Sequence, residues 1–166
     1  MSASIAAARR RSRRFDSLEQ EAFLNLWRTY DRLRAAEDEL FGQYDLSAQQ
    51  YNVLRLLCGE HPESLPTLVL AGRLVSRAPD ITRMLDHLER RELIQRQRLA
   101  GNRRVVRVGI TAAGLELLRK LDKPVRACHG RQLGHLPAEQ LRQLVALLQA
   151  ARGPHEPSDS NWTISS

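Results

Sequence analysis

The sequence is poor in aromatic residues, cysteine and long apolar runs, and each shortage narrows the class of protein. Aromatic residues make up 5% of the 166 residues, so the core has to be built mainly from Leu, Val, Ile and Ala. The two cysteines, Cys58 and Cys128, are too few for a disulfide framework, and we expect both to be small core residues. No apolar run approaches the ~20 residues of a membrane span, so we expect no contact with a membrane.

The motifs of enzymes and metal sites are also missing. The sequence has no glycine-rich loop that would cradle a phosphate and no strand–Ser–helix elbow. Its Cys and His residues do not have the spacing of a four-ligand zinc site. We therefore expect a protein without catalytic activity, cofactor or metal.

Charge is distributed unevenly along the chain. The net charge is +7, and only two of the 26 basic residues are lysine. Residues 1–15 contain five arginines and no acidic residue, residues 16–45 contain eight acidic residues against three arginines, and residues 73–107 contain ten arginines against four acidic residues. The planar fork of arginine suits bidentate contacts to phosphate and guanine. A G+C-rich genome would also favour arginine over lysine, so the clustering, rather than the bias, indicates a nucleic-acid-binding surface.

The ends of the chain differ from its middle. Residues 1–15 have no apolar periodicity and are predicted to be a disordered basic arm, and residues 154–166 a flexible tail. Apolar residues recur every three or four positions over residues 17–43, which predicts a long first helix. Ser47 and Gln50 have the spacing of a capping box, which predicts a second helix that ends near Gly59.

Two short helices and a hairpin are predicted next. Thr67 is expected to cap a third, short helix, and Pro79 to stand in the first turn of a fourth helix. The segments 94–99 and 103–110 flank a turn-forming loop, and the end of the second segment, residues 106–110, alternates apolar residues with Arg107 and Gly109, as a strand of a hairpin does. The predicted buried positions of the fourth helix are Ile81, Leu85 and Leu88.

Two further helices complete the predicted fold. Thr111 is expected to cap a fifth helix and Pro137 to open the last one. This order predicts a mainly α fold with a small β-hairpin wing, that is, a winged helix-turn-helix flanked by N- and C-terminal helices.

The fourth helix has an exposed face suited to reading DNA. The residues predicted on that face are Arg77, Asp80, Thr82, Arg83, His87 and Arg90. Arginine, threonine and histidine at the exposed N-terminal half of a helix can contact base edges in the major groove. Arg103 and Arg104 at the hairpin tip can reach the minor groove or phosphates. We therefore expect double-stranded DNA as the partner.

Four segments resemble the MarR family of bacterial transcription regulators. They are residues 70–74, 78–94, 102–104 and 110–114, and the resemblance extends over residues 17–152. It implies a homodimer, usually a repressor, in which residues 16–45 and 111–153 form dimerisation helices and residues 46–110 form the DNA-binding winged helix, with two winged domains on a palindromic operator. It places operator-reading residues at Ser76, Arg77, Thr82 and Arg83, and a minor-groove arginine at Arg104.

The sequence departs from the family pattern at two positions. Asn102 stands where the family usually has an aspartate that helps to hold the wing arginine, so the charge contribution to that contact is lost. Glu92 stands where a glycine usually precedes the hairpin, which suggests a differently closed turn.

The resemblance also implies an effector crevice, which Trp27, Tyr30 and Arg34 would line for a small aromatic or amphipathic molecule. These three residues could equally be ordinary core and surface residues.

The apolar stripes of the first and last two helices exceed what one winged domain can cover, which independently favours an isologous dimer. The alternative function is a winged-helix protein-interaction module without specific DNA binding, with which the acidic first helix is compatible.

The order of residues at the start of the sequence bears on location. Small apolar residues precede the arginines there, which is the reverse of a secretory signal. A cytoplasmic location is therefore expected, on the nucleoid when the protein is bound to DNA.

Overall fold

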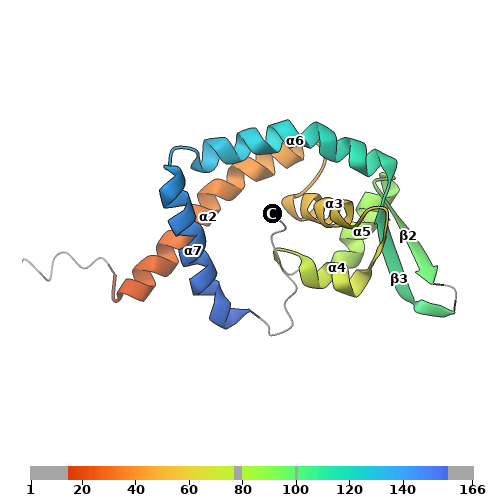
Figure 1. Cartoon of the computed structure of the whole chain (residues 1–166), viewed down its shortest axis with the longest axis horizontal. Helices are drawn as coiled ribbons and strands as arrows, with labels where there is room; N and C mark the ends of the chain where they lie inside the picture. Colours follow the sequence, from red (N-terminus) through yellow and green to blue (C-terminus); the bar gives the residue numbers. More distant parts are fainter. Residues whose placement is uncertain (1–14, 77–79, 100, 157–166) are drawn as a thin grey trace, which may run out of the picture. The chain divides into compact units, whose positions relative to one another are not determined.

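The computed structural model describes residues 15–76, 80–99 and 101–156, which fall into two units divided after Ala36. The described part is mainly helical and contains a three-stranded antiparallel sheet (Figure 1). This confirms the predicted fold class. The elements in chain order are α2 (Leu18–Gly42), α3 (Ala48–Glu60), β1 (Leu65–Pro66), α4 (Thr67–Arg73), α5 (Ile81–Arg90), β2 (Ile94–Leu99), β3 (Asn102–Ile110), α6 (Ala112–Leu133), α7 (Ala138–Arg152) and the 3-10 turn η1 (Gly153–His155).

Two predicted helix caps are present. The Ser47 hydroxyl accepts a hydrogen bond from the Gln50 backbone N–H at 3.1 Å, and the Gln50 side chain accepts from the Ser47 N–H at 2.8 Å. Thr111 caps α6 by accepting from the Gly114 N–H at 3.1 Å. Both caps satisfy backbone donors that have no partner within the helix, and this is why the sequence located these helix starts correctly.

The expected cap of α4 is wrong. Pro66 occupies the N-cap position, and Thr67 is the first helical residue. The Thr67 hydroxyl instead donates to the Val106 carbonyl oxygen of β3 at 3.1 Å. The Thr67 hydroxyl bonds to β3 instead of capping α4, because the pairing of β1 with β3 brings Thr67 next to β3.

The sequence predicted Pro79 in the first turn of α5, and Pro79 lies outside the described residues. The helix is described from Ile81, with Asp80 as its N-cap. Ile81 is only half-buried, and Met84 takes its place in the core beside the two correctly predicted leucines.

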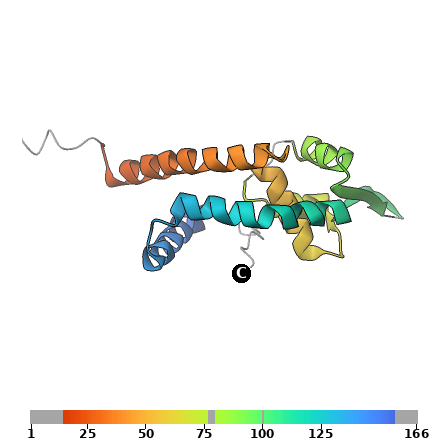
Figure 2. The ribbon, with the colours of Figure 1, turned by 90° about the horizontal axis from the view of Figure 1, so that it is seen from above.

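The sheet contains one strand that the sequence pattern did not reveal. β1 has two residues and pairs with β3, so that the strand order is β1-β3-β2. β2 and β3 pair from Ile94 opposite Ile110 to Arg98 opposite Val106, with an irregularity after Arg98. Figures 1 and 2 show this hairpin projecting beyond α3, α4 and α5.

The core of residues 37–166 joins α3, α4, α5 and α6 to the base of the hairpin. Its fully buried side chains are Val53, Leu54, Leu57, Leu70, Leu85, Leu88, Ile94, Val108, Leu121 and Cys128. Cys128 is buried as expected, and burial raises the pKa of its thiol, whereas Cys58 is only half-buried. No helix in the described part of the chain is long and apolar enough to cross a membrane.

The turn between α5 and β2 closes with Glu92 in the left-handed region, at φ +57°. Its N–H donates to the Glu89 carbonyl oxygen at 2.8 Å, and its own carbonyl oxygen accepts from the Thr111 hydroxyl at 2.6 Å. Glu92 thus adopts a conformation that glycine adopts at no steric cost. Two hydrogen bonds hold it there.

We expect Glu92→Gly to raise the free energy of unfolding by about 0.5–1 kcal/mol. A non-glycine residue in this region pays about 1–2 kcal/mol, part of which the greater entropy of unfolded glycine offsets. Urea unfolding at one fixed protein concentration measures the change, and Glu92→Ala, which removes the charge but keeps the strain, is the control. A Glu92→Gly variant no more stable than Glu92→Ala would contradict this account.

Candidate nucleic-acid interface

Helix α5 presents one apolar and one polar face. Asp80 caps it by accepting from the Arg83 backbone N–H at 2.9 Å. The cap therefore involves the backbone of Arg83 and not its side chain. Leu85 and Leu88 face the core, while Thr82 and Arg83 are exposed. The helix therefore offers hydrogen-bonding side chains in its N-terminal half, where a recognition helix contacts base edges.

The turn that precedes α5 is held against α3. The Gln49 amide donates to the Ser76 hydroxyl at 3.0 Å, and the Asn52 side chain accepts from the Val75 backbone N–H at 3.1 Å. Ser76, a predicted operator reader, is exposed and hydrogen-bonded to α3. The sequence reasoning missed the roles of Gln49 and Asn52, because their hydrogen-bond partners lie 27 and 23 residues later in the chain.

His87 turns toward the end of α2 rather than standing free. Its Nε2 lies 3.4 Å from the Asp45 carbonyl oxygen and 3.6 Å from the Asp45 carboxylate. Arg91 donates to the same carbonyl oxygen at 2.5 Å. Asp45 itself has φ +52°, in the left-handed region. The predicted reader His87 thus also connects α5 to the turn before α3.

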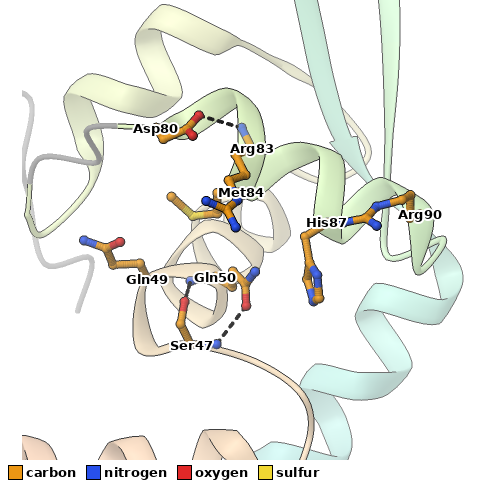
Figure 3. Close-up of a pocket in the computed structure, with 8 residues that line it drawn as sticks. All are labelled: Ser47, Gln49, Gln50, Asp80, Arg83, Met84, His87 and Arg90. Carbon is orange, nitrogen blue, oxygen red and sulfur yellow. Dashed lines mark hydrogen bonds between the residues drawn. The ribbon is translucent and has the colours of Figure 1, made fainter.

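An open hollow of ≈ 420 Å³ lies between the start of α3 and the polar face of α5. Figure 3 shows the residues that line it, which belong to α3, to α5 and to the N-cap positions of these two helices. They are Ser47, Gln49, Gln50, Asp80, Arg83, Met84, His87 and Arg90. Three of the α5 side chains are basic or can become so, against one acidic residue, so the surface around the hollow suits an anion.

The wing tip is a tight turn. Gly101 has φ +94°, and the Asn102 side chain accepts from the Arg104 backbone N–H at 3.2 Å. Asn102 therefore holds the backbone of Arg104, and the Arg104 side chain is exposed. Of the other predicted site residues, Arg77 lies outside the described residues, and the side chain of Arg103 is not among those described.

Arg96 on β2 makes the densest set of polar contacts near α5. Its guanidinium donates to the Glu89 carboxylate at 2.9 and 2.5 Å and to the Asp86 carboxylate at 2.6 Å. Hydrogen bonding to Arg96 holds the pKa of the Glu89 carboxyl below its usual value. The sequence reasoning missed Arg96, because its partners lie seven and ten residues earlier, on another element.

The residues predicted to line an effector crevice lie on the surface of α2. Trp27 and Tyr30 are about 60% exposed on α2, and Arg34, on the same helix, is also exposed. Within the ranges that the structure describes, no group of three or more His, Cys, Asp or Glu side chains could hold a metal ion.

Comparison with known proteins identifies the family. The model of the MarR family matches residues 46–106. The chain is 58% identical to a MarR transcription factor from Planctomyces limnophilus, over 82% of this chain and 99% of that chain, with a TM-score of 0.67. The chain belongs to the MarR family. It is accordingly a winged-helix transcription regulator and not an enzyme, as the sequence predicted.

Two other solved structures share the fold of this family member. Sco3205 from Streptomyces coelicolor, solved in complex with DNA, is 18% identical, covers 90% of this chain and 96% of its own and has a TM-score of 0.78. CouR from Rhodococcus jostii RHA1, solved with p-coumaroyl-CoA, is 24% identical, covers 87% of this chain and 100% of its own and has a TM-score of 0.71.

Proposed function

We propose that this MarR-family regulator is a repressor that binds an inverted-repeat operator as a homodimer and acts in the cytoplasm. The observation that carries the proposal is the exposed polar face of α5 beside a hairpin with an exposed arginine, Arg104, near its tip. Thr82 and Arg83 on α5 would read base edges in the major groove, and Arg104 would enter the minor groove. Ser76, Arg77, His87 and Arg103 complete the proposed contact surface.

Exposed apolar side chains support the homodimer. On α2, Leu18 and Phe23 are each more than 60% exposed. On α7, which has no buried residue, Leu147 is also more than 60% exposed. Large apolar residues gathered on helix surfaces mark sites of association, and a two-fold interface is the commonest arrangement. The dimer would place two recognition helices about one DNA turn, ~10 base pairs, apart.

A small aromatic or amphipathic effector is proposed to release the DNA. The CouR structure was solved with bound p-coumaroyl-CoA, a molecule with an aromatic group. In this chain Trp27 and Tyr30 offer exposed aromatic surface and Arg34 a positive charge on the same helix. Binding there would change DNA affinity only if the effector prefers one spacing of the two recognition helices.

Sequence selection followed by a binding titration tests the proposed function. A random-sequence duplex library is enriched on the purified protein, and the enriched duplex and a scrambled version are compared by fluorescence anisotropy over a salt series. We expect an inverted repeat to be enriched and its binding to outlast that of the scrambled duplex as salt rises, because base contacts add to the salt-sensitive phosphate contacts.

Two outcomes would overturn the proposal. Equal, salt-sensitive binding to both duplexes would leave only a basic surface without sequence preference. Absence of binding to either would favour a protein-interaction module that kept the winged fold.

A further inference from the structure

Arg96 connects the two elements that are proposed to meet DNA. It belongs to β2 of the wing, and both of its acidic partners belong to α5. The attachment is double, because the backbone N–H of Arg96 also donates to the second Glu89 carboxylate oxygen at 3.1 Å. β2 is an edge strand, and this N–H is on its outer side, where it bonds to Glu89 in place of a neighbouring strand.

Arg96 lies between the base of the hairpin and its outer part, so this contact can affect the direction of the outer part. At the base of the hairpin, Leu93 is tied to α5 by its N–H, which donates to the Leu88 carbonyl oxygen at 3.0 Å. Beyond Arg96, the side chains of Gln97 and Arg98 are exposed. A two-stranded ribbon has little stability of its own. The direction of the outer ribbon, which carries Arg104, therefore depends on Arg96 along β2 and on the hydrogen bond from Thr67 to the Val106 carbonyl oxygen along β3.

The charges explain why an arginine stands here. Asp86 and Glu89 are two carboxylates on the helix proposed to enter the major groove, and unpaired they would repel DNA phosphates. One guanidinium fork can engage both carboxylates at once, which an ammonium group does less well. The Arg96 side chain is 25% exposed, so its charge is directed to α5 rather than to solvent.

We infer that Arg96 is a positioning residue that, through Asp86 and Glu89, fixes the wing to the recognition helix, so that both meet DNA as one rigid surface. This role rests on the proposed function. Arg104 can then contact the minor groove while Arg83 contacts the major groove of the same DNA site. Arg96 acts through these two residues and makes no contact with DNA itself.

A double-mutant cycle between Arg96 and Arg104 tests the inference on the library-selected duplex. We expect Arg104→Ala to weaken binding by about tenfold in the wild-type protein. In an Arg96→Met background, the same change should weaken binding by about threefold or less, because the wing is no longer held in register. Independent residues would instead give effects that multiply to within about twofold.

Two further variants make the cycle decisive. Arg98→Met removes the same charge two residues further along β2, where the side chain is exposed, and its effect should multiply with that of Arg104→Ala. Arg96→Lys keeps the charge but not the fork, should stay folded, and should also reduce the effect of Arg104→Ala. It replaces Arg96→Met if thermal unfolding shows that the methionine variant does not fold.

The outcomes separate this inference from the proposed function. If the wild type selects a sequence but the Arg96 and Arg104 effects multiply, Arg96 is not a positioning residue while the regulator still reads DNA. If the coupling appears equally with Arg98→Met, a general charge effect replaces the inference. If no sequence is selected, both the inference and the proposed function are overturned.

Discussion

Gly114→Ala is expected to lower the free energy of unfolding by about 3 kcal/mol, the upper end of the usual range for overpacking a core. A Cβ at this position would lie 2.3 Å from the Leu93 carbonyl oxygen and 2.7 Å from Ile110 Cγ1. The carbonyl group cannot easily move, because it accepts from the Thr111 N–H at 3.1 Å. The added methyl group would therefore push α6 away from the start of the wing, and this outweighs the higher helix propensity of alanine.

Gly72→Ala is the matched control for this prediction. Gly72 lies in α4, and a Cβ there would meet no atom within 4 Å. Removing a helical glycine without a clash should raise the stability by up to about 1 kcal/mol. Urea unfolding of both variants at one protein concentration measures the contrast. Equal stability of Gly114→Ala and wild type would show that α6 does not pack this closely against Leu93.

Arg83→Ala is expected to weaken binding to the selected operator by about 1–3 kcal/mol, or about 5- to 150-fold, and to relax the preference at the bases it contacts. The Arg83 side chain is exposed, and its backbone N–H rather than its guanidinium is engaged by the Asp80 cap. The substitution should consequently leave the helix and the stability unchanged. Competition titrations with single-base variants of the operator measure the preference.

The control for Arg83→Ala removes an equal charge elsewhere. Arg119 lies on α6 with a side chain that is 70% exposed, and Arg119→Ala should reduce binding only slightly and equally for all sequences. If Arg83→Ala also weakened all sequences equally, Arg83 would be a phosphate contact rather than a reader of bases.

Much of the fold followed from local features of the sequence. The start of α3 was predictable from Ser47 and Gln50, and that of α6 from Thr111, because a cap is a hydrogen bond between residues three apart. The hairpin was predictable because alternation has a period of two, which a strand alone satisfies. The exposed face of α5 followed in the same way from the spacing of its apolar residues.

Errors arose where a distant residue competes with a local one. Thr67 has the chemistry of a cap, yet its hydroxyl bonds to β3, 39 residues later. β1 is too short to show a period, and only its pairing with β3 defines it. Glu92 adopts a left-handed conformation that its residue type does not favour, since hydrogen bonds to α5 and α6 hold it there.

The sequence by itself determined the order of the helices and the hairpin, the family and the basic face of the recognition helix, since these depend on residues close to each other in the chain. Only the tertiary structure decided which arginines remain available for DNA. Arg83 and Arg96 have the same chemistry, but Arg96 is placed against Asp86 and Glu89, whereas Arg83 is exposed. That difference depends on how β2 folds back along α5, a packing arrangement that no spacing within a single element encodes.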